Sequence, residues 1–343
     1  MAVRCRPLDE GSAAAWDDFV LARPEGTFFH RAAWRHVITR TFRHPSCYLL
    51  AEQDGAVTGV LPLVHVKTRL FGNGLVSVPF CVYGGPVAAD ADTEAALERE
   101  AATAMRKSGA AFCEFRFLGR PDCAWPESPA LYETFRKHLA STDEANLKAI
   151  PRKQRAVVRK GIANGLVARV GREADPLFRL YAESVRNLGT PVYPRGYFRL
   201  LLDLFPESAE ILTVEDGGRP IAAVLSFMFR NEILPYYAGG GRAARGLAAH
   251  DFMYWEVMRL AVARGLDLFD FGRSKVGTGS HAFKKNWGFA PQPLHYRHLL
   301  APGARMPENN PLNPRYRMMI AAWKRMPLPV ANWLGPHIVR GIG

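Results

Sequence analysis

The sequence is 343 residues long, which exceeds the usual size of one domain and predicts two domains or one large one. Hydrophobic residues make up 48% and charged residues 22%, which excludes wholesale disorder, collagen-like repetition and a polytopic membrane protein. Lysine and arginine outnumber aspartate and glutamate by 45 to 32, giving a net charge of +13. This charge favours a polyanionic partner such as RNA, a nucleotide cofactor or an anionic lipid surface.

The cysteines and the N-terminal segment indicate the cellular compartment. Five widely spaced cysteines, with no histidine at a zinc-binding spacing, predict reduced thiols and no metal site. The first twelve residues are charged and lack an apolar core, and the longest apolar run, 221–229, is about half a membrane span. We therefore expect a cytoplasmic protein. If it contacts the inner membrane, the contact is peripheral.

Alternating and helical hydrophobic patterns predict the same series of elements in each half of the chain. The first series is strands 46–52 and 56–66, a strand ending in Tyr83-Gly84-Gly85, a helix at 92–107 and a strand at 111–117. The second series is strands 209–214, 221–229 and 232–238, a helix at 250–264 and a strand at 266–271.

Spacing within the two series indicates an internal repeat. In each half a helix-stopping glycine is followed five residues later by an acidic residue, Gly109 by Glu114 and Gly265 by Asp270. Each acid precedes a phenylalanine. The alternative is that any two α/β segments share hairpins and helix stops.

A duplicated unit of this kind fits a mixed sheet with a ligand site at the strand-to-helix turn, as in the GNAT acyltransferase fold. The sequence therefore predicts an α/β protein with two tandem GNAT-like domains, whose mixed sheets are flanked by helices. The expected divisions are domain 1 at 1–145, domain 2 at 146–300 with a basic linking helix at 146–174, and a Pro-rich linker with a basic, aromatic tail at 301–343.

Three segments of the second half resemble the FemAB family of tandem-GNAT transferases. They are LKAIPRKQRAVVRKGIANGL (147–166), RNLGTPVYPRGY (186–197) and LDLFDFGRSKVGTGSHAFKKNWGF (266–289). The resemblance is greatest to the FemAB-like branch associated with exosortase and exopolysaccharide loci. It implies transfer of an acyl or aminoacyl group onto an amine, with aminoacyl-tRNA or acyl-CoA as co-substrate and no tightly bound cofactor.

Lys284 is the candidate cation for the oxyanion that forms during amide synthesis. By resemblance it belongs to the Phe-Lys motif of FemAB-like enzymes, with Phe283 at the substrate; the alternative is a solvated lysine beside a buried phenylalanine. Asp270 lies on an apolar strand face, where an unpartnered acid is costly. It is either a general base or the structural partner of an arginine such as Arg273, itself a candidate substrate contact.

Two segments are candidates for binding phosphate on the donor. The turn after the 232–238 strand offers glycines and arginines where GNAT domains carry a pyrophosphate loop, although a plain strand-to-helix turn is the alternative. The link from Lys148 to Arg172 has eight basic residues and no acidic one. A solvated helix normally mixes signs, so we expect a phosphate-bearing ligand, with a simple basic surface as the alternative. The residues concerned are Gly240, Gly241, Arg242, Arg245 and Gly246 in the turn, and Arg152, Lys153, Arg155 and Arg159 in the link.

The remaining candidates concern the acceptor and the tail. By resemblance, the loop bearing Arg186, Tyr193, Arg195 and Tyr197 meets the acceptor, and Tyr237 contributes from the neighbouring strand. Residues 315–343 combine basic and aromatic side chains without an acid, which predicts either a membrane-surface element or packing on the protein.

Together these observations predict an N-acyltransferase or aminoacyltransferase that forms an amide on a phosphate-bearing amine of a cell-envelope or exopolysaccharide precursor, without binding DNA. One alternative is a CoA-dependent N-acyltransferase of a small amine. The other is a non-catalytic scaffold that binds RNA or a membrane.

Overall fold

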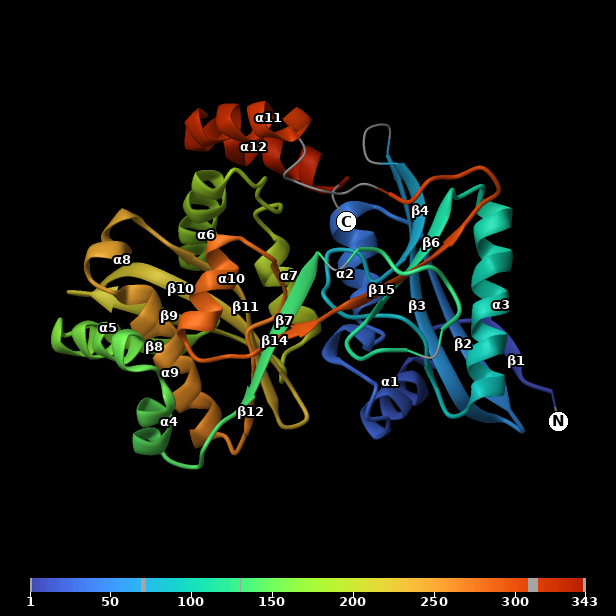
Figure 1. Ribbon diagram of the computed structural model, residues 1–343, viewed down its shortest axis with the longest axis horizontal. Helices are drawn as coiled ribbons and strands as arrows, with labels where there is room; N and C mark the ends of the chain where they lie inside the picture. The colour runs from blue at the N-terminus through green and yellow to red at the C-terminus, as the bar shows by residue number, and fades with distance from the viewer. Residues whose placement is uncertain (1, 69–71, 122, 130, 308–313, 342–343) are drawn as a thin grey trace. The chain divides into compact units, whose positions relative to one another are not determined.

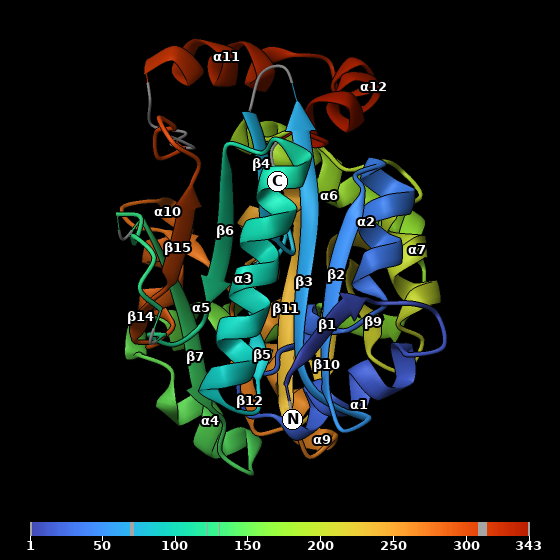
Figure 2. The same cartoon turned by 90° about the vertical axis from the view of Figure 1, so that its right-hand side faces the viewer.

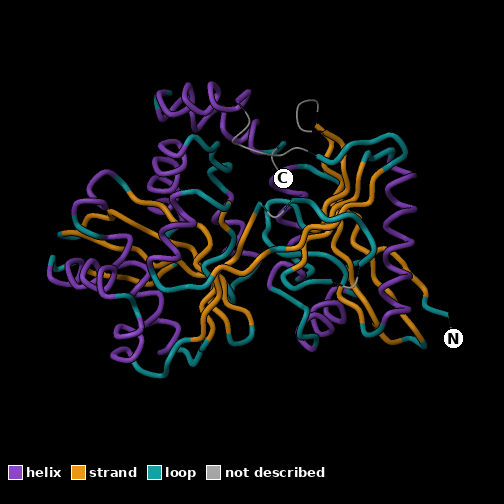
Figure 3. The backbone as a smooth tube through the Cα atoms, viewed as in Figure 1, coloured by secondary structure: helices purple, strands orange, loops and turns teal. Residues whose placement is uncertain are grey.

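The computed structural model describes residues 2–68, 72–121, 123–129, 131–307 and 314–341, and the chain forms two compact units. Unit 1 contains Met1–Leu131, Pro293–Asn310 and Arg340–Gly343, and unit 2 contains Tyr132–Gln292 and Pro311–Val339. The expected boundary followed residue 145, whereas these units divide after Leu131. Of the expected Pro-rich linker, residues 308–313 lie outside the described part of the chain. Figures 1 and 3 show that each unit is built on a sheet with flanking helices.

Unit 1 has the sheet order β1-β2-β3-β4-β6-β15, with β5 paired to β3. The pair β4 and β6 is parallel, and the others are antiparallel. Figure 2 shows α3 lying along this sheet. The strands are β1 (Arg4–Pro7), β2 (Ser46–Gln53), β3 (Ala56–Thr68), β4 (Gly72–Ser77), β5 (Val87–Ala88), β6 (Phe112–Phe117) and β15 (His295–Leu300); the helices are α1 (Ala13–Ala22), α2 (Trp34–Phe42) and α3 (Ala91–Ser108), with a 3-10 turn at Phe28–His30.

Unit 2 has the sheet order β13-β7-β12-β11-β10-β9-β8, with β14 paired to β7. Here β11 and β12 are the parallel pair. The strands are β7 (Tyr132–His138), β8 (Val167–Gly171), β9 (Ala209–Asp216), β10 (Arg219–Phe229), β11 (Glu232–Gly240), β12 (Leu268–Asp270), β13 (Ser274–Lys275) and β14 (Pro291–Pro293). The helices are α4 (Asp143–Ala149), α5 (Arg152–Ala163), α6 (Ala174–Leu188), α7 (Tyr197–Leu204), α8 (Arg242–Gly246), α9 (Ala249–Ala263), α10 (Gly279–Asn286), α11 (Pro314–Arg325) and α12 (Leu328–Val339).

Comparison of the two strand orders confirms the internal repeat. In each sheet three antiparallel neighbours lead to a strand that pairs in parallel with the strand after the helix, as β4 does with β6 and β11 with β12. A last antiparallel strand then completes the sheet. This strand is exchanged between the halves, because β7 follows β6 in the chain but pairs with β12, whereas β15 pairs with β6.

The structure corrects one predicted strand of the first half. The third strand of the first half ends at Ser77 rather than at Tyr83-Gly84-Gly85. The residues that follow form a buried loop, in which Val78 and Phe80 adopt positive φ angles of 49° and 69°. Alternation of apolar residues looks the same in a buried loop as in a strand, so the sequence pattern could not separate them.

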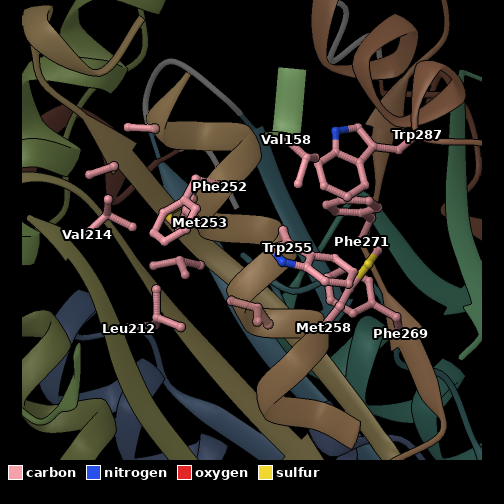
Figure 4. Packing of buried hydrophobic residues seen from close by; sticks show 14 of the residues in the cluster. Val158, Leu212, Val214, Phe252, Met253, Trp255, Met258, Phe269, Phe271 and Trp287 are labelled. Atoms are coloured by element: carbon pink, nitrogen blue, oxygen red, sulfur yellow. The ribbon is translucent and has the colours of Figure 1, made fainter. Parts of the chain in front are cut away.

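The core of unit 2 places the helices that carry the candidate site. Helix α9 packs Phe252, Met253 and Met258 against the sheet, as Figure 4 shows. Val158 of α5 and Trp287, which follows α10, belong to the same buried cluster. Burial of these apolar side chains fixes α5 against α9 and the end of α10 in the same core. Within the described ranges no helix combines the length and apolar character needed to cross a bilayer.

Candidate active site

Lys284 lies in the last turn of α10, a helix whose start is capped by the side chain of Thr278. Its side chain is buried, with 9% exposed, and Nζ donates to the carbonyl oxygens of Gly272 (2.9 Å) and Arg273 (3.1 Å). Nζ also lies 5.5 Å from the centre of the Phe135 ring. Burial lowers the pKa of Lys284 to about 7, and the charge of Asp270 only partly opposes that effect. The chain therefore holds an amine that titrates near neutral pH.

Asp270, the last residue of β12, is fully buried and pairs with an arginine from the exchanged strand. Its Oδ2 lies 3.3 Å from Nε of Arg136 on β7, and the same guanidinium contacts Glu232 on β11. Burial, followed by the nearby charge of Asp270, raises the pKa of Glu232. Two carboxylates thus share one guanidinium. The sequence considered Arg273 as the partner, but the Arg273 guanidinium lies 4.7 Å from the centre of the Tyr132 ring.

A turn links Asp270 to Lys284. Asp270 Oδ1 accepts a hydrogen bond from the backbone N–H of Gly272 (2.6 Å), and the Gly272 carbonyl accepts one from Lys284 Nζ (2.9 Å). Gly272 has φ of 66°, a conformation that favours glycine. Asp270 therefore shapes the turn that holds Lys284, which favours the structural interpretation of this acid over a general base.

The sequence analysis did not single out five polar residues around this turn. Arg136 and Glu232 complete the ion pairs, and His281 Nε2 donates to Glu133 Oε2 at 2.6 Å. The Ser274 hydroxyl is buried without a hydrogen-bond partner among the described residues. A charged residue within an apolar strand, the signal that identified Asp270, also marks Glu232 at the start of β11.

The parallel strands beside Lys284 separate soon after they meet. β11 and β12 pair at Glu232 with Leu268 and at Ile233 with Phe269. β12 ends at Asp270, but β11 continues to Gly240. Within the described chain, this edge of β11 therefore has no strand partner beyond Ile233.

The three predicted tyrosines lie together in unit 2. The hydroxyls of Tyr197 and Tyr237 are 2.7 Å apart, and the ring of Tyr193 stacks on Tyr197 with centroids 4.5 Å apart. Tyr181 of α6, which the sequence analysis missed, packs edge-on against Tyr237. Tyr236, the next residue of β11, has a ring atom 4.0 Å from the position of a Cβ built on Gly272. The aromatic cluster thus adjoins the turn that holds Lys284.

The other predicted acceptor contacts are dispersed. Arg186 donates to the backbone carbonyl of Lys324 in α11 (3.1 Å), and the exposed Arg195 is 3.5 Å from Asp175. Phe283 packs on the ring of Tyr254. Arg186 therefore has a structural contact that the sequence did not predict.

The glycines of the predicted phosphate loop have packing roles. A Cβ on Gly239 would lie 2.4 Å from Cα of Tyr181, and one on Gly240 would lie 2.4 Å from the His250 ring. These adjacent residues face opposite sides of the sheet, towards α6 and α9 respectively. The sequence had assigned Gly240 to phosphate contact, but close packing also explains it.

Beyond Gly241, whose N–H donates to the Ile221 carbonyl, the short helix α8 precedes α9. Gly246 has open space around it, and Arg242 and Arg245 are exposed. Burial, with a further contribution from the charge of Arg245, lowers the pKa of His250 in the first turn of α9. The loop thus presents two arginines near the start of α9.

The basic link, expected as one helix over 146–174, is instead divided into the end of α4, helix α5 and strand β8, because Pro151 and Gly165 interrupt it. Helix α5 lies against the start of α9. Asn164, just after α5, donates to the carbonyl of Leu247 (3.0 Å), and Gln154 contacts Asp251, which also accepts from Trp287 Nε1 (3.2 Å). The basic residues face outwards. Among the described residues none of the following has an ion pair or a hydrogen-bonded side chain: Arg152, Lys153, Arg155, Arg159 and Lys160.

Two basic residues of the link have structural contacts instead. Arg169 pairs with Glu215, and Arg172 donates to three backbone carbonyls, those of Leu202, Pro206 and Ala209. The unpaired charge is therefore concentrated on α5.

Residues 145–285 match a family model described as an acetyltransferase (GNAT) domain. No curated protein sequence matches the chain. The crystal structure of FemX aligns with a TM-score of 0.67 and 15% identity, covering 86% of this chain and 97% of FemX. The C-terminal domain (DUF2156) of a protein assigned as a lysylphosphatidylglycerol synthetase from Agrobacterium fabrum aligns with a TM-score of 0.57 and 13% identity, covering 86% and 93%.

A tandem GNAT protein from the clavulanic acid biosynthesis pathway aligns with a TM-score of 0.55 and 11% identity, covering 87% of this chain and 98% of that protein. At such identities these structures establish the fold, and they confirm the predicted mixed α/β architecture. The family match over residues 145–285, together with this fold, supports an acyltransferase.

Proposed function

We propose that the protein transfers an acyl or aminoacyl group from an activated ester or thioester to an amine and so forms an amide bond. In this proposal the acceptor is a phosphate-bearing amine of a cell-envelope or exopolysaccharide precursor, as the resemblance to the exosortase-associated FemAB-like branch suggests. The observation that carries the proposal is Lys284, a buried amine with a pKa of about 7 beside the diverging strands of a GNAT domain.

In the proposed reaction the acceptor nitrogen attacks the carbonyl carbon of the donor. The ammonium form of Lys284 stabilises the oxyanion of the tetrahedral intermediate. The C–O or C–S bond of the donor then breaks, and the leaving hydroxyl or thiol takes up the proton that the amine loses. Asp270 acts through the Gly272 turn, because it fixes the carbonyl groups that hold Lys284.

Aminoacyl-tRNA is the first candidate donor. Helix α5 exposes a run of unpaired basic side chains, the surface that a nucleic-acid backbone requires. The name of one aligned structure, the C-terminal domain of a protein assigned as a lysylphosphatidylglycerol synthetase, also supports aminoacyl transfer.

Acyl-CoA is the second candidate donor, and the GNAT domain match favours it. The turn after β11 weakens this candidate, because close packing occupies the side-chain positions at Gly239 and Gly240.

The test incubates the purified full-length protein in two separate reactions, one with labelled aminoacyl-tRNA and one with labelled acyl-CoA. Each reaction contains a Gram-negative cell extract as the source of acceptors. Mild alkali removes ester-linked label, so the label that remains is amide-linked. We expect transfer from one donor, and Lys284→Ala lowers the rate about 100- to 1,000-fold. Lys285→Ala is the matched control, because Lys285 is the exposed neighbour on α10. A folded Lys284→Ala protein with the wild-type rate would refute the proposal.

A non-catalytic scaffold makes a different prediction. Such a protein would label no acceptor with either donor, and a Lys284→Ala gene would complement a deletion strain fully. We propose the cytoplasm as the site of action, where both candidate donors occur.

A further inference from the structure

Several large apolar side chains of unit 2 are exposed on α6, α11 and α12. Among the described residues the three most exposed large hydrophobic side chains are Met318 (79%), Leu188 (69%) and Trp333 (70%). They belong to α11, the end of α6 and α12. An exposed tryptophan with neighbouring apolar side chains marks an interaction surface more often than a lone exposed leucine does.

The two C-terminal helices are fixed to α6 and to the loop that follows it, as Figure 1 illustrates. A Cβ on Gly189 would lie 2.5 Å from Cγ2 of Ile320, and one on Gly335 would lie 2.9 Å from the backbone N of Val192. Arg186 adds a hydrogen bond to the end of α11. The inner faces of α11 and α12 are therefore occupied by the protein itself.

The outer face of α12 carries two exposed apolar side chains and a histidine. Val330, Trp333 and His337 recur at helical spacing and are exposed, whereas Ala331 and Gly335 are buried. On α11 the exposed residues include two methionines and two cations. We call the following the α11–α12 surface: Met318, Met319, Lys324, Arg325, Val330 and Trp333.

Charge decides which partner fits this surface. Residues 311–343 contain five lysines and arginines and no acidic residue. A second copy of the chain would bring the same positive charge to the contact, which is unfavourable. An anionic bilayer offers the opposite charge and an apolar layer beneath it, and each cation near such a bilayer strengthens binding.

We propose that the α11–α12 surface docks on an anionic lipid bilayer. Trp333, Met318 and Val330 enter the headgroup–acyl boundary, and Lys324 and Arg325 lie at the phosphates. The proposal depends on these helices alone and not on the chemistry at Lys284, so either can fail without the other.

The test mixes the full-length protein with vesicles of two compositions. One is pure phosphatidylcholine, and the other contains about 30% phosphatidylglycerol, whose anionic headgroups give the vesicle a negative surface potential. We expect flotation with the anionic vesicles, weakened by salt. The double variants Met318→Ser/Trp333→Ser and Lys324→Glu/Arg325→Glu should each lower the partition coefficient about 10-fold or more.

Matched controls change exposed residues of unit 2 outside this surface. Ile162→Ser/Val276→Ser removes apolar side chains, Arg219→Glu removes a cation, and both should float as the wild type does. Equal flotation of the two surface variants and the wild type would overturn the proposal. Binding that is lost only when the arginines of α5 are replaced by glutamate would also overturn it, as would a wild-type dimer that Met318→Ser/Trp333→Ser dissociates while no vesicle binds.

Discussion

Replacement of Lys284 by methionine keeps the length of the side chain and removes its charge. If the ammonium stabilises the oxyanion, Lys284→Met lowers kcat/KM about 100- to 1,000-fold at pH 6, where about 90% of a group with a pKa of about 7 is protonated. At pH 9 only about 1% of the wild-type amine is protonated, so the same ratio falls to between about 2 and 12.

The assay measures kcat/KM for both proteins from pH 5.5 to 9.5 at constant ionic strength. The acceptor amine also titrates in this range, but its ionisation affects both proteins equally and cancels in the ratio of wild type to Lys284→Met. We expect the ratio to decrease as the pH rises through about 7. A ratio that increases with pH would show that the neutral amine of Lys284 acts as a base, and a ratio near 1 throughout would refute any role in the reaction.

Three further predictions follow from the buried charges. Asp270→Asn removes the charge that raises the pKa of Lys284, so the decrease in the ratio moves to lower pH; a midpoint that stays in place would show that the Asp270 charge does not act on Lys284. Lys284→Met should have a higher free energy of unfolding than the wild type, and the difference should be greatest at low pH. In urea titrations this difference should shrink by about 1.4 kcal/mol per pH unit between pH 7 and 10, because in that range the lysine of the wild type binds a proton only in the unfolded state. For Glu114, burial would raise the pKa, but Arg116 and His298 hold it at about 2. The wild type should therefore lose about 3 kcal/mol of unfolding free energy between pH 4.5 and 2, and Glu114→Gln should lose correspondingly less in the same titration.

The repeat was accessible from the sequence because it depends on local spacing, whereas Lys284 was identified only through the resemblance of its Phe-Lys motif to FemAB-like enzymes. Turn glycines and apolar periodicity located most strands and helices, and an acid on an apolar strand identified Asp270. The helix-stopping residues Gly109 and Gly265 adopt the positive φ angles that this interpretation requires, 63° and 71°.

The partners of these residues were not accessible, because they come from distant strands. Arg136 lies more than a hundred residues before Asp270, and no pattern in β7 indicates that it pairs in the second sheet. The same limit applies to Gly240. The sequence alone does not distinguish a glycine required by close packing of the His250 ring from a glycine that lets the backbone approach a phosphate.

The exchange of β7 and β15 makes the two halves inseparable in synthesis and in evolution. A ribosome that has completed β6 must still produce about 180 residues before β15 can cover its open edge, which leaves that edge exposed to wrong pairing in the nascent chain. A gene cut between the repeats would likewise encode two fragments, each carrying a strand that fits the other fragment. Once the exchange had arisen after duplication, selection acted on both copies as a single heritable unit.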